Sequence, residues 1–222
     1  MASIDPKIWG SSAWILLHDI SFYVAESEKN GDHYAMKDAK RFFMILRGVL
    51  PCIRCQLSYD GHLLNMPFPK DGRDLPKWVF DLHNRVNDNR NHASKQDTHT
   101  HTHRLQWSSW SVSYKADLAN RRLKDIWPFI QSVVEIYPYG NKFEVSIYRH
   151  NIREFFKLLW NFLKNMEGYS KDMLLIEDHV NMNEIDNNIG SRSKLLKWVT
   201  DMGRKAHILS KKYSNCDKVC SV

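Results

Sequence analysis

The chain has 222 residues, which is long enough to bury a sizeable core. Of these residues 43% are hydrophobic and 26% charged, and this composition excludes collagen-like, disordered and disulfide-held miniature proteins. The formal net charge is +7, from 32 basic and 25 acidic residues. The basic residues are scattered, which favours a solvated basic surface over contact with nucleic acid or an acidic membrane. No apolar run approaches the roughly 18 residues of a membrane span. The N-terminus has no apolar stretch typical of a secretory signal, so we expect a soluble protein.

Apolar residues recur at helical spacing through the first half of the chain, and the predicted fold class is all-α. A first helix is expected over about residues 11–26, and Asp32 can cap a second helix. Pro51 suits the first position of a third helix, because proline lacks the N–H that would be unpaired there. A fourth helix is expected over about residues 73–90. The polar stretch 91–103 is predicted to be a loop.

The second half of the chain is also mostly helical by pattern. After helical spacing from Trp110 to Val134, a turn at 137–140 precedes a possible short strand. The residues of this predicted strand are Phe143, Val145 and Ile147. Helices are expected again around 152–163 and 195–208. The sequence therefore predicts two domains: residues 1–115, and a mostly helical C-terminal domain of residues 116–222.

The chain has four cysteines, which fall in two close pairs. Cys52 and Cys55 form a C-x-x-C, and Cys216 and Cys220 form a C-x-x-x-C near the end of the sequence. Without a secretory signal, such local pairs indicate redox or metal chemistry rather than a disulfide framework. The spacing alone leaves a redox pair and a zinc site equally open. The loop residues His99, His101 and His103 are better explained as solvated than as metal ligands, because alternation in a polar loop fixes no geometry.

The predicted position of Cys52 and Cys55 favours a reactive thiolate. Both lie in the first turns of an expected helix, where unpaired N–H groups and the helix dipole stabilise an anion, and Arg54 adds a cation between them. A thioredoxin-like protein would place a strand before the motif, whereas a helix is expected here.

Polar side chains lie on the apolar faces of two expected helices. Trp14 and His18 stand four residues apart on the first helix, and polar residues with the same spacing occupy the fourth helix, namely His83, Asn84 and Asn87. Burying them between helices costs a few kcal/mol each unless partners are supplied. Each could be a satisfied core residue. Together, beside a C-x-x-C, they favour a planar polar cofactor held within the bundle.

Three motifs in order resemble the Erv/Alr family of FAD-linked sulfhydryl oxidases. Residues 10–18 are similar to its G-x-x-x-W-x-x-L-H, and Tyr23 follows at a matching place. Residues 51–55 followed by Tyr59 and by His62 resemble P-C-x-x-C…Y…H-L, and residues 83–87 match H-N-x-V-N. The resemblance covers only the N-terminal half.

The resemblance implies an Erv-type four-helix bundle with a short fifth helix, which binds FAD and is usually a homodimer. It implies that Cys55 lies against the isoalloxazine and that Cys52 exchanges with substrate. The residues that it places around FAD are Gly10, Trp14, His18, Tyr23, Cys55, His83, Asn84, Val86, Asn87 and Trp107, with Trp110 as a rival for Trp107.

The chain departs from the family pattern in two ways. The lysine that follows H-N-x-V-N in the family is absent, and Arg90 or Lys95 could replace it at FAD. The structural cysteines of cellular members are also absent, which together with the extra C-terminal domain favours a large-DNA-virus enzyme. Family members often carry a second, mobile dithiol, and Cys216–Cys220 could act as such a shuttle, because tethering raises its effective concentration. Exposed thiols without a role, or a small closed loop, are the alternatives.

The predicted function is that of an FAD-dependent thiol oxidase that makes disulfides in protein substrates and reduces O₂ to H₂O₂. Its expected partners are protein dithiols, such as a viral thioredoxin-like or virion protein, with neither nucleic acid nor a membrane. No metal site is expected, and its location would be the host cytoplasm, a virus factory or the virion. The alternatives are a structural or interaction protein that binds zinc through both cysteine pairs, and an idle scaffold that binds FAD without turnover.

Overall fold

A computed structural model describes residues 3–93, 106–137 and 143–209. Within these ranges the chain is built of helices, without a strand, so the all-α prediction is confirmed. Their bounds are α1 (Pro6–Lys29), α2 (Tyr34–Val49), α3 (Ile53–Asn65), η1 (Gly72–Asp74), α4 (Leu75–Ala93), α5 (Trp107–Asp117), η2 (Leu118–Asn120), α6 (Leu123–Glu135), α7 (Phe143–Asn165), α8 (Glu167–Leu175), η3 (Glu177–His179), α9 (Met182–Asn188) and α10 (Arg192–Lys205).

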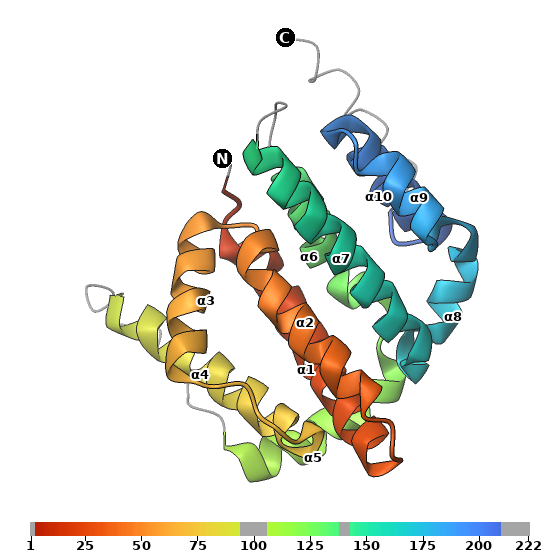
Figure 1. The fold of residues 1–222 in the computed structure, drawn as a ribbon. Coiled ribbons are helices and arrows are strands. Elements are labelled where there is room, and N and C mark those ends of the chain that lie inside the picture. Colours follow the sequence, from red (N-terminus) through yellow and green to blue (C-terminus); the bar gives the residue numbers. More distant parts are fainter. Residues whose placement is uncertain (1–2, 94–105, 138–142, 210–222) are drawn as a thin grey trace.

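The pair α1 and α2 lies in the middle of the molecule (Figure 1). On one side α4 packs against α1, and α3 packs against α2. On the other side α6 packs against α1 and α7 against α2, with α10 on the outer face of α6. The segments before and after residue 115 therefore meet along the whole α1–α2 pair.

One continuous apolar core joins both halves of the chain. Phe42 of α2 stacks on Phe155 of α7 with ring centroids 5.5 Å apart, and Trp9 of α1 lies 5.8 Å from Phe129 of α6. Gly168 lets α8 approach η2, because a Cβ there would lie 2.5 Å from the backbone oxygen of Leu118. Burial of these large rings is the main stabilising contribution.

The strand predicted from Phe143, Val145 and Ile147 is wrong, because all three lie in helix α7. Val145 is buried and Ile147 is exposed, whereas a strand would place both on the same face. Apolar residues at every second position over so short a run do not distinguish a strand from a helix. Packing decides for the helix. Tyr148, three residues after Val145, is buried as well and donates a hydrogen bond of 2.8 Å to the carbonyl oxygen of Val133 in α6.

The prediction that Pro51 opens the third helix is also wrong by two residues. Helix α3 begins at Ile53, and Cys52 is its N-cap with an extended backbone. The carbonyl oxygen of Pro51 accepts a hydrogen bond of 2.8 Å from the N–H of Ile4, which holds Pro51 outside the helix. The first helix begins earlier than expected, at Pro6, because Asp5 caps it through the N–H of Lys7.

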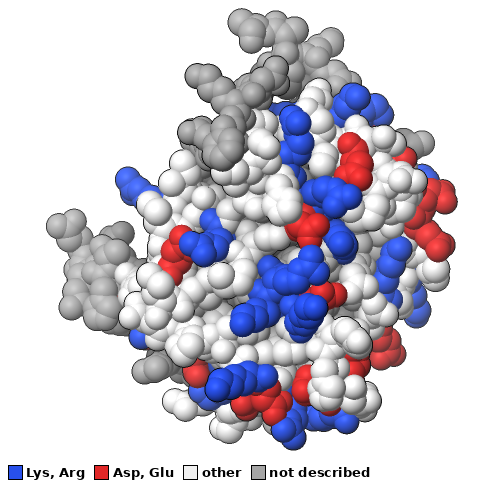
Figure 2. All heavy atoms as spheres, viewed as in Figure 1, with Lys and Arg blue, Asp and Glu red and all other residues white. Residues whose placement is uncertain are grey.

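The surface carries mixed charge. On the face shown in Figure 2, Lys and Arg gather over α2 and α7 with Asp and Glu among them. Several of these form ion pairs, such as Arg41 with Glu154 at 2.6 Å and Arg153 with Asp186 at 2.6 Å. None of the described helices is long and apolar enough to cross a membrane.

Candidate functional site

A disulfide joins Cys52 and Cys55 at the start of α3, with Cα atoms 5.1 Å apart. The Sγ of Cys52 accepts a hydrogen bond of 3.2 Å from the N–H of Cys55. The preceding segment is held in place, since the side chain of Gln56 donates a hydrogen bond of 2.9 Å to the carbonyl oxygen of Leu50. Cys52 is 7% exposed, whereas Cys55 is partly buried. The pair therefore lies at a helix N-terminus, where backbone N–H groups stabilise a thiolate after reduction.

Two further residues of the cysteine motif fix α3 in the bundle. The hydroxyl of the buried Tyr59 donates a hydrogen bond of 3.0 Å to the carbonyl oxygen of Phe43 in α2. The buried His62 lies 3.4 Å from the hydroxyl of Ser58. Burial, and to a smaller extent the positive charge of Arg85 in α4, lower the pKa of His62. The motif thus seats α3 against α2.

The structure brings Trp14, His18 and His83 together between α1 and α4. The indole of Trp14 stacks on the ring of His83 with centroids 4.0 Å apart and planes 10° from parallel. The Nε2 of His18 lies 3.1 Å from the Nδ1 of His83, and this hydrogen bond requires one of the two nitrogens to carry the proton. These contacts join the first and third sequence motifs at one place.

His18 is buried and neutral. It is 2% exposed, and burial, followed by the charges of His83 and Arg121, lowers the pKa of His18 from 6.5 to about 3. Its Nδ1 is buried without a hydrogen-bond partner. An unpartnered buried polar atom costs about 1–3 kcal/mol, so this nitrogen is available to a polar group of a bound cofactor. The residues present therefore fit a planar, hydrogen-bonding group such as FAD.

Helix α5 adds an aromatic wall to this cluster. The ring centroid of Trp110 lies 4.6 Å from that of His18, and Trp107 stacks on Phe22 at 6.4 Å with planes 3° apart. Phe80 of α4 contacts both tryptophans, at 5.3 Å and 5.0 Å. Both candidate tryptophans of the sequence analysis thus belong to the same group of rings.

The other residues that the family resemblance places around FAD lie as follows. Asn84 is buried, with 7% exposed, and Val86 and Asn87 are half-buried on α4. Gly10 lies in α1, and a Cβ there would have no atom within 4 Å. Tyr23 instead packs edge-on against Phe162 of α7, with ring centroids 6.0 Å apart.

Sequence reasoning missed Asp19, Tyr114 and the rings of Phe22 and Phe80. Asp19 is 2% exposed, and its carboxylate binds the hydroxyl of Tyr114 at 2.6 Å. The sequence does show a carboxylate directly after His18 within an apolar helix. Such a position indicates a buried polar cluster, because a carboxylate is buried only where partners are supplied. Its hydrogen-bond partners Tyr114 and Tyr169 lie 95 and 150 residues away and could not be predicted.

Several predicted residues lie outside the part of the chain that the structure describes. They are Cys216, Cys220, Lys95, His99, His101 and His103. The side chain of Arg90 is not described either. Within the described ranges, no group of three or more His, Cys, Asp and Glu side chains could hold a metal ion. The zinc hypothesis therefore gains no support from the described residues.

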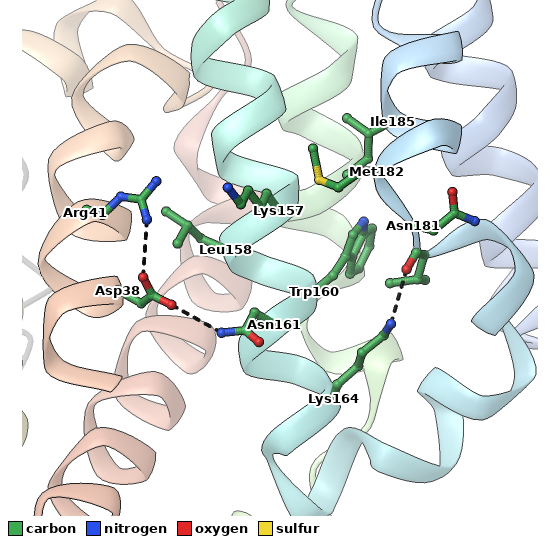
Figure 3. A pocket seen from close by; sticks show the side chains of 11 residues that line it. Asp38, Arg41, Lys157, Leu158, Trp160, Asn161, Lys164, Asn181, Met182 and Ile185 are labelled. Carbon is green, nitrogen blue, oxygen red and sulfur yellow. Dashed lines mark hydrogen bonds and ion pairs between the residues drawn. The ribbon is translucent and has the colours of Figure 1, made fainter. Parts of the chain in front are cut away.

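A surface pocket of about 390 Å³ lies between α2, α7 and the η3–α9 segment, separate from the predicted site (Figure 3). Four of its polar side chains are engaged in contacts within the chain. Asp38 pairs with Arg41 at 3.3 Å and accepts from Asn161 at 3.3 Å, and Lys164 donates to the carbonyl oxygen of Val180 at 3.2 Å. These contacts join α2, α7 and the segment after η3, so we interpret them as structural.

Comparison with known proteins confirms the resemblance for the first half of the chain. Residues 11–108 match the model of the Erv1/Alr family. A probable FAD-linked sulfhydryl oxidase of Acanthamoeba polyphaga mimivirus is 30% identical over 90 residues, which cover 38% of this chain and 59% of that protein. A protein of Invertebrate iridescent virus 3, provisionally named an FAD-linked sulfhydryl oxidase, is 31% identical over 88 residues, covering 38% of this chain and 57% of that protein.

A more distant relative is Sulfhydryl oxidase 2 of Arabidopsis thaliana, 28% identical over 86 residues, which cover 38% of this chain and 16% of the plant protein. The chain thus spans less than two thirds of the length of each of these relatives. No solved structure matches it significantly.

Proposed function

We propose that this chain, whose residues 11–108 match the Erv1/Alr family, is an FAD-dependent sulfhydryl oxidase that forms disulfides in protein substrates. The overall reaction converts two thiols and O₂ into a disulfide and H₂O₂. The observation that carries the proposal is a buried, neutral His18 with an unpartnered nitrogen, set among aromatic rings in the helical unit that also holds the Cys52–Cys55 disulfide. The names of the two viral relatives describe the same chemistry.

Cys52 and Cys55 would exchange with the substrate. A substrate thiolate attacks the Cys52–Cys55 disulfide, and the second substrate thiol then resolves the mixed disulfide. This releases the substrate disulfide and leaves two thiols on α3. The helix N-terminus, where the N–H of Cys55 already points to the Cys52 sulfur at 3.2 Å, stabilises the thiolate formed. When bound, FAD accepts two electrons from the cysteine pair and passes them to O₂.

The residues around His18 would bind and orient the cofactor. Trp14 and the α5 tryptophans offer ring faces, Asn84 offers an amide, and the neutral His18 offers its unpartnered Nδ1. The protein thus supplies binding and orientation while the redox chemistry belongs to the cofactor. We assign flavin binding to the domain predicted over residues 1–115 and a supporting role to residues 116–222.

The finer assignments rest on the resemblance. Cys55 would face the flavin and Cys52 the substrate, and Cys216–Cys220 would shuttle electrons from substrate to Cys52. The enzyme would act as a homodimer on viral thioredoxin-like or virion proteins, in the host cytoplasm, a virus factory or the virion. The two viral relatives support a viral origin.

A visible absorption spectrum of the purified protein, repeated after adding dithiothreitol, tests the proposal. A flavin band that bleaches, and recovers in air with release of H₂O₂, is expected. The same sample under nitrogen should stay bleached, which identifies O₂ as the acceptor. A colourless protein with stoichiometric zinc would overturn the proposal in favour of the zinc-binding alternative, and a yellow protein that dithiothreitol does not bleach would indicate an idle scaffold.

A further inference from the structure

The buried carboxylate of Asp19 joins three segments of the molecule. Its Oδ1 lies 2.6 Å from the hydroxyl of Tyr114 in α5, and its Oδ2 accepts a short hydrogen bond from Tyr169 in α8. The Nε of Arg121, which follows η2, lies 3.5 Å from Oδ1. Asp19 is 2% and Tyr169 1% exposed. Hydrogen bonds to a buried charge are the strong ones, so this group fixes its partners firmly.

The same carboxylate is one residue from the candidate flavin site. Asp19 follows His18 in α1, and the ring centroid of Tyr114 lies 5.3 Å from that of His18. Tyr114 also packs on Trp110 at 4.7 Å, and the guanidinium of Arg121 lies 4.9 Å above its ring. The position of Tyr114 thus determines how Trp110 of α5 lies against the ring of His18.

Tyr114 has only one proton to give. Its hydroxyl lies 2.6 Å from Asp19 and 3.0 Å from the carbonyl oxygen of Ile15, so Asp19 and the backbone of α1 compete for it. The hydroxyl of Tyr169 occupies the second oxygen of Asp19 and thereby directs the first toward Tyr114. Without Tyr169, the carboxylate would lose the partner that fixes its rotation.

We infer that Asp19 and Tyr169 are positioning residues for the flavin site, through which the C-terminal half holds α5 over His18. The inference rests on the proposed function and gives residues 116–222 a specific part in it. A hydroxyl that arrives from α8, 150 residues away in the sequence, sets the orientation of the carboxylate beside the cofactor-binding histidine.

Replacement of Tyr169 by Phe tests this inference, because it removes only the hydroxyl. FAD titrated into flavin-free protein should bind Tyr169→Phe with a Kd about three- to tenfold higher, because the lost hydroxyl acts on the site only indirectly, through Asp19 and Tyr114. The visible band and the fluorescence of bound flavin should also change, because Trp110 and Tyr114 move. A merely structural role would leave the spectrum of the bound flavin unaltered.

Tyr148→Phe is the matched control. Tyr148 is another buried tyrosine of the C-terminal half, and its hydroxyl donates to the carbonyl oxygen of Val133 instead of to Asp19. It should lower the melting temperature about as much as Tyr169→Phe but leave FAD affinity and spectrum as in the wild type. Asp19→Asn, which keeps the shape but not the charge, should weaken FAD binding as well, and it serves as the second variant if Tyr169→Phe does not fold.

The outcomes separate the two proposals. A wild type that binds FAD, with Tyr169→Phe and Asp19→Asn indistinguishable from it, would overturn this inference and leave the proposed function standing. Equal loss of FAD affinity in Tyr148→Phe would also overturn it, since the effect would then be general destabilisation. A wild type that binds no FAD would overturn the proposed function and this inference with it.

Discussion

At the residue scale, the site is a set of polar groups buried in an apolar bundle, and their protonation follows from that burial. His18 stays neutral because burial, followed by the charges of His83 and Arg121, disfavours a charged imidazole and lowers its pKa. Asp19, one residue away, keeps hydrogen-bond donors on both oxygens. Burial nevertheless raises its pKa, although Tyr114, Tyr169 and Arg121 act in the opposite direction. Two neighbouring residues of α1 thus tolerate burial in different ways: His18 by staying neutral, and Asp19 by pairing both of its carboxylate oxygens.

Replacement of either cysteine of the redox pair by serine should abolish turnover. Cys52→Ser and Cys55→Ser remove the disulfide that accepts electrons, so dithiothreitol oxidation, followed as oxygen uptake, should fall at least about a hundredfold. FAD should remain bound to Cys52→Ser, because the residues proposed to hold it are unchanged in that variant. Cys216→Ser is the control and should retain dithiothreitol oxidation, since a small dithiol needs no shuttle. Full turnover by Cys52→Ser would contradict the proposed chemistry.

The low pKa of His18 predicts acid sensitivity. The unfolded chain takes up a proton near pH 6.5, whereas folded His18 does so only near pH 3. Between these values the unfolded state binds more protons, so the free energy of unfolding falls as the pH is lowered from 6.5. The loss from this residue should reach about 2 kcal/mol at pH 5.

Urea unfolding at several pH values, with His18→Gln beside the wild type, measures this contribution. The variant should lose less stability on acidification, and the carboxyl groups common to both proteins cancel in the comparison. His150→Gln, at an exposed histidine of α7, is the control and should follow the wild type. Parallel curves for wild type and His18→Gln would show that His18 takes up its proton normally.

At the scale of single elements, the molecule depends on how closely helices can approach. Gly168 is the second residue of α8 and precedes Tyr169. It lies against the backbone of Leu118 in η2 and of Arg121. Gly61, in the middle of α3, has no atom within 4 Å of the place of a Cβ. The same substitution should therefore act in opposite directions at these two glycines.

Gly168→Ala should destabilise the protein and Gly61→Ala should stabilise it. A Cβ at Gly168 would meet the Leu118 oxygen at 2.5 Å and Arg121 atoms at 3.0 Å, and relief by backbone movement costs about 1–3 kcal/mol. Alanine at Gly61 should gain about 0.5–1 kcal/mol from helix propensity. Thermal unfolding by circular dichroism measures both. A Gly168→Ala protein as stable as the wild type would show that the approach of α8 to η2 does not require glycine at this position.

At the scale of the whole molecule, the α1–α2 pair is shared between the two halves. It carries the proposed flavin site on the side of α4 and packs against α6 and α7 on the other. Because one apolar core runs through both halves, neither half can unfold without exposing the other. If the proposed flavin site binds FAD, we therefore expect stability and flavin binding to be coupled through this core.

Phe155→Ala, far from the site, should lower the temperature of flavin release together with that of helix loss. Phe155 is fully buried in α7 and stacks on Phe42, so truncation should cost about 3–5 kcal/mol. Flavin fluorescence and circular dichroism, followed in one thermal scan, should give coincident transitions. Flavin release at the wild-type temperature, with early loss of helix, would indicate that the two halves unfold independently.

The local sequence determined a great deal about this protein. Helical spacing, the C-x-x-C at a helix start and the three ordered motifs predicted the all-α class, the family resemblance and the shared face of Trp14 and His18 on the first helix. These features depend on residues close in sequence, whose spacing by itself places them on one helix face or at one helix end.

The tertiary structure decided everything that depends on which helix faces meet. It put Phe143 in a helix, turned Tyr23 toward α7 and brought Tyr169 to Asp19. It also placed Trp110 against His18, with Trp107 beside Trp110. The physical reason is that periodicity marks a buried face without naming its partner. Partners far along the chain are selected by packing and by the need to pair buried polar groups, and these are properties of the assembled core.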